Sequence, residues 1–180
     1  MKTLENKRFI IENKTGYTPM TGRLLSMMDY TRMTTLDAVV GLSVEELDYR
    51  INGKGNSIGC LLYHMACLEE IYQISTFEDR DFTKEELQRL TVGFELGEKA
   101  HKEIKGKEID FYLEQLSKVR ERTLDLFKQI KDIWLDEVSP IGPNDVANNY
   151  FRWFHVFEDE LNHRGQIRLI RNHMNREQEN

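Results

Sequence analysis

The chain has 180 residues, enough for one domain with a sizeable hydrophobic core. Its 25 Lys and Arg are interspersed with 31 Asp and Glu, which gives a formal net charge of −6. This balance argues against nucleic acid as the main partner, because binding to a phosphate backbone depends on clustered basic residues.

The sequence also argues against a membrane as a partner. No stretch approaches the ~18 consecutive apolar residues of a membrane span. Residues 1–14 are polar and charged, and they lack the apolar core of a signal peptide. We therefore expect a cytoplasmic protein.

The first half of the chain is predicted to form two long helices. The first begins at Thr18-Pro19, a capping residue followed by proline at the first helical position. A short helical turn is predicted at 43–47, where Ser43 and Glu46 have capping-box spacing, and a loop is predicted at 51–56. The second long helix is predicted from about Asn56 to Phe77. The apolar residues assigned to the first helix include Leu24, Met28, Met33, Leu36, Val39 and Val40.

The second half is predicted to contain two more long helices. A connection at 78–108 holds a helix at 83–96, because Thr83 and Glu86 again have capping-box spacing. The third long helix is predicted at 109–131. A proline-containing loop is predicted at 139–144, followed by a last helix at 145–172.

Four long helices predict an all-α protein, and specifically a four-helix bundle. It would be a single domain, residues 1–180, with polar termini at 1–14 and 175–180. Short links make the first and second helices, and the third and fourth, antiparallel neighbours. The link between the second and third helices is long enough for a crossover that leaves these two helices parallel, although a connection of this length can also wander.

Polar residues interrupt the apolar stripes of two predicted helices. The stripe of the last helix carries Asp159 and His163, and the stripe of the second helix carries His64. Burying an unpaired polar group costs ~1–3 kcal/mol, so both interruptions need an explanation. Residues four apart lie about 6 Å from each other on one helix face, so Asp159 and His163 can share one ion with His64.

Two imidazoles and a carboxylate suit a divalent zinc, nickel, iron or manganese ion. Three protein ligands leave a position open for water or substrate, whereas a structural site normally has four. The alternatives are a hydrogen-bonded core histidine at position 64 and a local ion pair between Asp159 and His163. His155 is an alternative ligand, a neighbour of the site, or simply a partly exposed helix histidine, which is slightly favoured because His155 lies about 80° around the helix from His163.

Two cysteines and one glycine also have defined expectations. Cys60 and Cys67 lie seven positions apart on one predicted helix, roughly 10 Å, which is too far for a disulfide. They are expected to be small buried hydrophobes. Gly165 costs ~1 kcal/mol relative to Ala in a helix, which indicates a close approach of another helix. Gln166 is expected to orient a ligand, or else to be solvated.

Two stretches of the sequence, residues 56–64 and 155–167, resemble the DinB/YfiT-like superfamily of metalloenzymes. The resemblance implies a four-helix bundle with one metal held by three residues, usually all histidine. By position, these residues are His64, Asp159 and His163. In having an acid at position 159, the sequence resembles the mycothiol-dependent maleylpyruvate isomerase branch, which uses an acid at that place. The alternative is that Asp159 is a degraded ligand in a protein that has lost its metal.

The resemblance implies a metal-dependent enzyme that uses a low-molecular-weight thiol such as bacillithiol or mycothiol. A divalent ion lowers the pKa of a thiol, and the resulting thiolate attacks an electrophilic small-molecule substrate. A metal-activated hydrolase and a non-catalytic metal-binding or stress-response protein are the alternatives. A homodimer is also predicted, because one small bundle is not expected to bury all of Tyr30, Phe111, Tyr112, Phe127, Trp134, Phe151 and Trp153.

Overall fold

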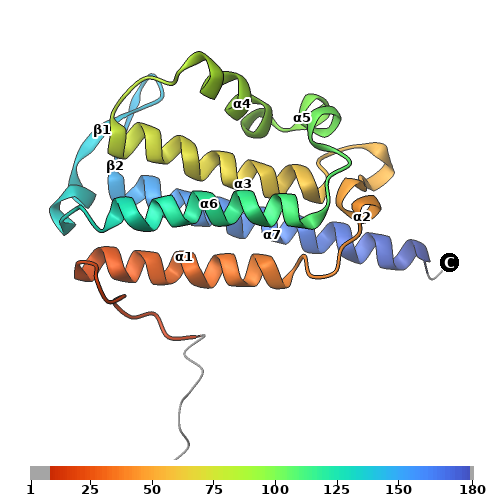
Figure 1. The fold of residues 1–180 in the computed structure, drawn as a ribbon, viewed down its shortest axis with the longest axis horizontal. Coiled ribbons are helices and arrows are strands. Elements are labelled where there is room, and N and C mark those ends of the chain that lie inside the picture. Colours follow the sequence, from red (N-terminus) through yellow and green to blue (C-terminus); the bar gives the residue numbers. More distant parts are fainter. Residues whose placement is uncertain (1–8, 179–180) are drawn as a thin grey trace, which may run out of the picture.

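The protein is mostly helical, as predicted. The computed structural model describes residues 9–178. The elements are α1 (Pro19–Asp37), α2 (Val44–Asp48), the 3-10 helix η1 (Ile51–Gly53), α3 (Ile58–Gln73), the π-helix η2 (Ile74–Glu78), α4 (Lys84–Glu95), α5 (Gly97–Ile104), α6 (Ile109–Phe127), the 3-10 helix η3 (Asp132–Asp136), β1 (Val138–Ile141), β2 (Asp145–Asn148) and α7 (Asn149–Gln178). The long helices α1, α3, α6 and α7 lie side by side along the molecule (Figure 1).

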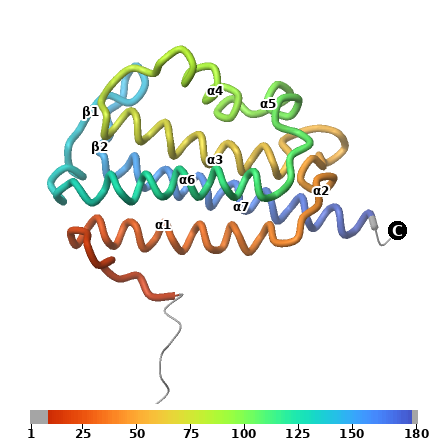
Figure 2. The backbone as a smooth tube through the Cα atoms, viewed as in Figure 1, coloured from red at the N-terminus to blue at the C-terminus, as the bar shows by residue number. Residues whose placement is uncertain are grey.

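The long helices run in two directions. The tube in Figure 2 shows α1 and α7 running one way and α3 and α6 running the other way. The connection between α3 and α6 carries α4 and α5 back along the outside of α3, against which both short helices pack. Helix α3 also packs against α6 and α7, and α7 packs against α1. Helices α3 and α7 are therefore direct neighbours that run in opposite directions.

Three predicted helix starts are confirmed. Helix α1 begins with Pro19 at its first position, after Thr18. Ser43 and Glu46 form a complete capping box before α2, and Thr83 and Glu86 form another before α4. In each box the hydroxyl accepts from a backbone N–H while the carboxylate accepts from the capping residue's own N–H. Local chemistry thus defines where these helices begin.

The region before the last helix differs from the prediction. Residues 138–148 form an antiparallel hairpin in which Val138 pairs with Asn148 and Ile141 with Asp145. The last helix therefore begins at Asn149, not at 145, and the Asn148 side chain accepts a hydrogen bond of 2.8 Å from the backbone N–H of Phe151.

Other boundaries also differ from the prediction. Helix α7 continues through 175–178, where a polar tail was predicted, and residues 1–8 and 179–180 lie outside the described residues. Helix α6 ends at Phe127, before the predicted 131, and α5 was not predicted.

The two larger apolar clusters of the core have polar residues between them. Along α7, Trp153 and Val156 belong to one cluster, and Ile167 and Ile170 belong to the other. The residues between them on the buried side of the helix include polar ones, as the predicted stripe indicated. Several aromatic residues from which a homodimer was predicted fit inside one chain, since Tyr112, Phe127 and Trp153 are fully buried.

The buried face of α1 is also polar in its second half. The prediction placed Leu36 and Val40 on the apolar side of this helix, but both are exposed, and Val40 lies beyond the helix end. The buried residues there are Thr31, Arg32, Thr34 and Thr35. Arg32 is one of the polar residues of the core.

Four charged side chains, one from each long helix, meet in the core: Arg32, Glu69, Arg120 and Glu160. We call them the buried quartet, and each is at most 8% exposed. The Arg32 Nε lies 3.0 Å from Glu160 Oε1, and its Nη2 lies 3.0 Å from Glu69 Oε2. The Arg120 Nε donates to Glu69 Oε1 over 2.7 Å. Arg32 thus joins the acids of α3 and α7, so the quartet fixes these two helices relative to each other.

Two helix glycines, Gly59 on α3 and Gly165 on α7, provide a matched test of how closely the helices pack. A Cβ on Gly59 would collide with the Tyr112 hydroxyl and would lie 2.7 Å from its Cζ, whereas a Cβ on Gly165 would meet nothing within 4 Å. The predicted close approach at Gly165 is therefore wrong. We expect Gly59→Ala to lower the free energy of unfolding by ~1–3 kcal/mol and Gly165→Ala to raise it by up to ~1 kcal/mol. Urea denaturation measures both, and a neutral Gly59→Ala would contradict the packing described here.

Candidate metal site

His64, Asp159 and His163 meet between α3 and α7. One potential ligand atom from each residue lies within 4.8 Å of the other two. The Asp159 carboxylate stands between the imidazoles, with Oδ2 3.4 Å from the His64 Nε2 and Oδ1 3.4 Å from the His163 Nε2. The two imidazole rings are 4.8 Å apart between centroids and nearly perpendicular, at 79°. The structure therefore brings together the three residues selected from the sequence, which we call the candidate group.

A backbone carbonyl from α4 orients His64. Its Nδ1 lies 3.0 Å from the Gly93 carbonyl oxygen, which accepts a hydrogen bond when Nδ1 carries the proton. In that tautomer Nε2 has a free lone pair on the side of Asp159. Metal-binding histidines commonly use their second nitrogen in this way. The arrangement is therefore suited to binding a cation through Nε2.

Unsatisfied polar atoms in the candidate group provide a test of whether it fits a metal. Both histidines are buried, and Asp159 is partly buried. Within the described residues, Asp159 Oδ2 and His163 Nδ1 are buried without a hydrogen-bond partner. Buried polar atoms are normally satisfied, and a carboxylate facing two imidazoles presents one anionic and two neutral donors to a cation. The residues present fit a divalent ion.

The Asp159 carboxylate stays ionised. Burial raises the pKa of its carboxyl, but the neighbouring His163 and His64 more than offset this effect, and the pKa is lowered well below its usual range. A carboxylate must be deprotonated to bind a metal. Asp159 therefore has the charge state that a ligand needs.

The buried quartet positions both halves of the candidate group. Glu160 directly follows Asp159 on α7, and Glu69 lies five residues after His64 on α3. Both acids bind the guanidinium of Arg32 from α1. Because side chains one residue apart on a helix point about 100° apart, Glu160 reaches the core while Asp159 faces α3.

His155 and Gln166 lie outside the candidate group. The His155 imidazole is partly exposed, its Nδ1 lies 3.0 Å from Glu158 Oε2, and its ring stacks parallel to Phe151. Gln166 is exposed on α7. Roles for either residue in orienting a ligand stay predictions.

The chain's own thiols are buried away from this chemistry. Cys60 and Cys67 are free, as predicted, and fully enclosed. Burial raises the pKa of the Cys67 thiol to about 12 and also raises that of Cys60. The thiolate is the nucleophilic form of cysteine, so neither residue is poised to act as a nucleophile.

The chain also matches a known protein family. The sequence profile of the mycothiol-S-transferase family matches residues 23–176, which include all three residues of the candidate group. The chain belongs to the mycothiol-S-transferase family. This family is DinB/YfiT-like, so the resemblance inferred from the two motifs is confirmed. A comparison with curated proteins gave no match.

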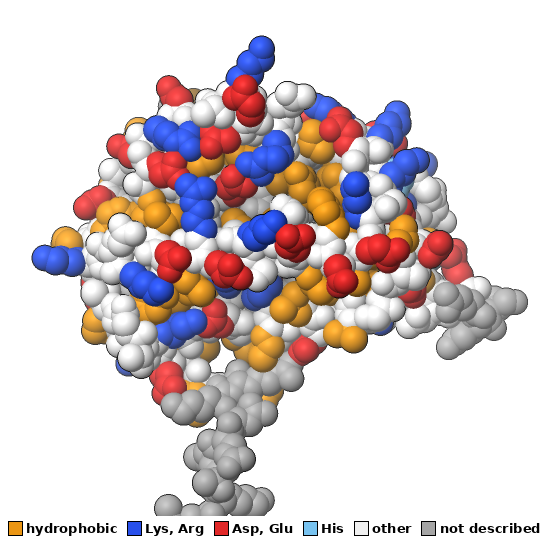
Figure 3. Space-filling model, in the orientation of Figure 1, with side chains coloured by type: hydrophobic (Ala, Val, Ile, Leu, Met, Phe, Trp, Pro, Cys, Tyr) orange, Lys and Arg blue, Asp and Glu red, His pale blue; other side chains and the backbone are white. Residues whose placement is uncertain are grey.

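Membership of the mycothiol-S-transferase family connects the chain to small-molecule thiol chemistry. Among the described residues, no helix is long and apolar enough to cross a membrane. On the face drawn in Figure 3, basic and acidic side chains are mixed, with hydrophobic side chains between them.

Sequence reasoning missed several residues around the site. Arg32 and Arg120 were not selected, and Glu160 was noted only as part of a motif. Gly93 and Phe94 were not considered, because α4 was predicted only as part of a connection. A signal for the quartet did exist, since Arg32 and Glu160 follow the spacing of buried positions on their helices.

Proposed function

We propose that this chain is a metal-dependent enzyme that activates a small thiol cosubstrate for transfer to an electrophilic substrate. The observation that carries the proposal is the convergence of His64, Asp159 and His163 from two helices, with ligand atoms within 4.8 Å of one another. Membership of the mycothiol-S-transferase family supports a thiol as cosubstrate. The three residues would hold one zinc, nickel, iron or manganese ion and leave a position open.

A bound divalent ion supplies positive charge that lowers the pKa of a thiol, so that thiolate is available near neutral pH. In the transfer, the thiol proton goes to solvent, a carbon–sulfur bond forms, and the leaving group departs from the same carbon with its electron pair. The residues of the chain orient this chemistry: Gly93 and the buried quartet position the candidate group. The buried Cys60 and Cys67 do not compete with the cosubstrate.

The first experiment tests the metal. We expect purified wild-type protein to hold about one divalent ion per chain, and His64→Ala and His163→Ala to hold less than about a tenth of that. The control is His173→Ala. His173 lies on α7, like His163, but its Nδ1 is 2.9 Å from the Tyr49 hydroxyl oxygen. His155→Ala decides whether that residue is an alternative ligand. Equal, low metal content in wild type and variants would falsify the site.

The second experiment tests the activity of the metal-loaded protein. We expect mycothiol to be consumed together with a generic electrophile, and a thioether to form. Bound metal without transfer from any small thiol would favour a metal-binding protein without this activity. Hydrolysis of the electrophile without consumption of the thiol would favour a metal-activated hydrolase.

The proposal includes an architecture and a setting. We propose a single domain spanning residues 1–180, a four-helix bundle with a crossover between its second and third helices. The parallel course of α3 and α6 supports it. The homodimer, the cytoplasmic location and the absence of nucleic-acid and membrane partners stay predictions from the sequence, which size exclusion and localisation would test.

A further inference from the structure

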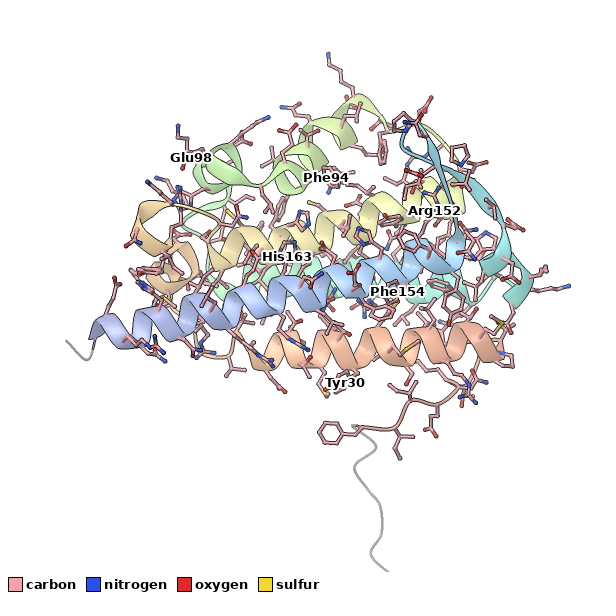
Figure 4. All side chains as sticks on the ribbon, turned by 180° about the vertical axis from the view of Figure 1, so that it is seen from behind. Tyr30, Phe94, Glu98, Arg152, Phe154 and His163 are labelled. Carbon is pink, nitrogen blue, oxygen red and sulfur yellow. The ribbon has the colours of Figure 1, made fainter. Side chains whose placement is uncertain are left out.

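Helix α4 contributes two neighbouring residues to the surroundings of His64, and neither is in the candidate group. The Gly93 carbonyl oxygen lies 3.0 Å from the His64 Nδ1. The Phe94 ring stacks on the same imidazole, with 6.1 Å between centroids and 28° between planes. In Figure 4, which views the molecule from behind, Phe94 on α4 lies above His163 on α7.

Packing in the core does not explain the position of Phe94. Its residue surface is 51% exposed, whereas Leu90, Val92 and Gly93 are the buried residues of the same helix. A phenyl ring left half in water forgoes much of its burial free energy. Single exposed hydrophobic residues are common, but this one lies against a buried histidine that belongs to the candidate group. One face of the ring is thus directed to the site while the rest meets solvent.

The backbone around Phe94 is held firmly against α3. A Cβ on Gly93 would collide with the Cys67 Sγ and would lie 3.0 Å from Tyr63 Cδ1, so only glycine allows this approach. Just past Phe94, the helix ends where Leu96 adopts a φ of 55°. The Gly97 N–H then donates over 3.0 Å to the Asn56 side chain, next to the start of α3. The ring is therefore presented from a fixed position.

We propose that Phe94 is a specificity-determining residue for the electrophilic substrate, which accepts the thiol in the transfer. This proposal rests on the function proposed above. Its exposed ring forms an aromatic wall beside His64. A flat aromatic acceptor that enters the site can stack on this wall and bury its own ring. A small aliphatic acceptor gains little from the same contact, so the wall favours aromatic electrophiles.

The test compares two electrophiles with mycothiol as the thiol. 1-Chloro-2,4-dinitrobenzene is aromatic and releases chloride; iodoacetamide is small and aliphatic and releases iodide. We expect Phe94→Ala to lower kcat/KM by ~10–100-fold for the aromatic electrophile and by less than ~2-fold for iodoacetamide. Phe94→Tyr keeps the wall and is expected to stay near wild type. The control is Phe151→Ala, because Phe151 is 47% exposed and also stacks on a histidine, His155, but lies outside the candidate group.

Two binding measurements separate this proposal from the function on which it rests. We expect zinc affinity, from chelator competition, to be the same within ~3-fold in Phe94→Ala and wild type, because Phe94 holds no metal. We expect the dinitrophenyl conjugate of mycothiol, in calorimetry, to bind ~10-fold more weakly to the variant.

Equal conjugate binding, an equal loss for both electrophiles, or a collapse of zinc affinity in the variant would overturn the role of Phe94. Absence of wild-type turnover with either electrophile would instead overturn the proposed function.

Discussion

Replacing Glu69 with alanine is expected to lower the free energy of unfolding by about 3–5 kcal/mol. The Glu69 side chain is fully buried and accepts hydrogen bonds from Arg32, Arg120 and the Thr123 hydroxyl. Its removal leaves two buried guanidinium groups with only Glu160 to compensate them. Within the described residues, Arg120 Nη1 already lacks a hydrogen-bond partner, so the cavity worsens an existing deficit. Urea denaturation in the presence of a chelator measures the change without a contribution from bound metal.

The neighbouring Glu70 is a matched control. Its carboxylate lies 2.6 Å from Arg89 at the surface, where both side chains are partly exposed. Surface ion pairs of this kind contribute about 0–1 kcal/mol, so Glu70→Ala is expected to unfold nearly like wild type. If Glu69→Ala and Glu70→Ala lost the same small amount of stability, the buried quartet would not be what fixes the four helices relative to one another.

The pH dependence of the same comparison has a defined sign. Burial raises the pKa of Glu69, but Arg120 and Arg32 more than offset it, so the folded-state pKa lies below its ordinary value. A lowered folded-state pKa adds stability at pH values above the unfolded pKa of about 4.3. This contribution is lost as the pH falls below that value. The difference in the free energy of unfolding between wild type and Glu69→Ala is therefore expected to shrink on acidification below pH ~4.3.

Local signals in the sequence predicted much of the secondary structure. The capping boxes at Ser43 and Thr83 and the proline at position 19 each involve residues within one helical turn, so their geometry does not depend on the rest of the fold. The hairpin at 138–148 was missed because its prolines indicated a loop and its strands have only four residues each. Such short strands carry too little alternation to be recognised.

The pairing of charges within the buried quartet could not be predicted from the sequence, although the spacing of Arg32 and Glu160 on their helices is that of buried positions. Arg32 and Glu160 are 128 positions apart, and charged residues are almost never fully buried unless they are paired. No local pattern shows that the partner exists. The expectation that Leu36 and Val40 would face the core followed the usual preference for apolar residues. The buried face in the second half of α1 instead contains Arg32 and three threonines, Thr31, Thr34 and Thr35.

The candidate group was accessible from the sequence for a different reason. His64, Asp159 and His163 occupy positions in otherwise apolar stripes, and two of them share one helix, so periodicity alone placed them toward the core. Periodicity did not show what lies on the remaining side. Gly93 and Phe94 come from a short helix in the long connection, and their approach to His64 depends on how the chain returns over α3.

Asp159 is the residue at which the candidate group departs from three histidines, and removing its charge is expected to weaken metal binding strongly. We expect Asp159→Asn to weaken zinc affinity by ~100-fold or more, because even residues that only support a ligand commonly contribute 10–100-fold. Asparagine keeps the size of the side chain but removes the charge. Because the pKa of Asp159 is held well below its usual range, the wild-type carboxylate is ionised at the near-neutral pH at which zinc affinity is measured by chelator competition.

Two further variants decide how this result is interpreted. Glu158→Gln removes a charge at the adjacent position, where the carboxylate contacts His155, and is expected to bind zinc like wild type. Asp159→His supplies the residue usual at this position in the resembled superfamily and is expected to retain most of the affinity. If Asp159→Asn and Glu158→Gln bound zinc equally well, Asp159 would not be a ligand. The two histidines alone would then hold the ion weakly, as expected for a protein in which the third ligand has degraded.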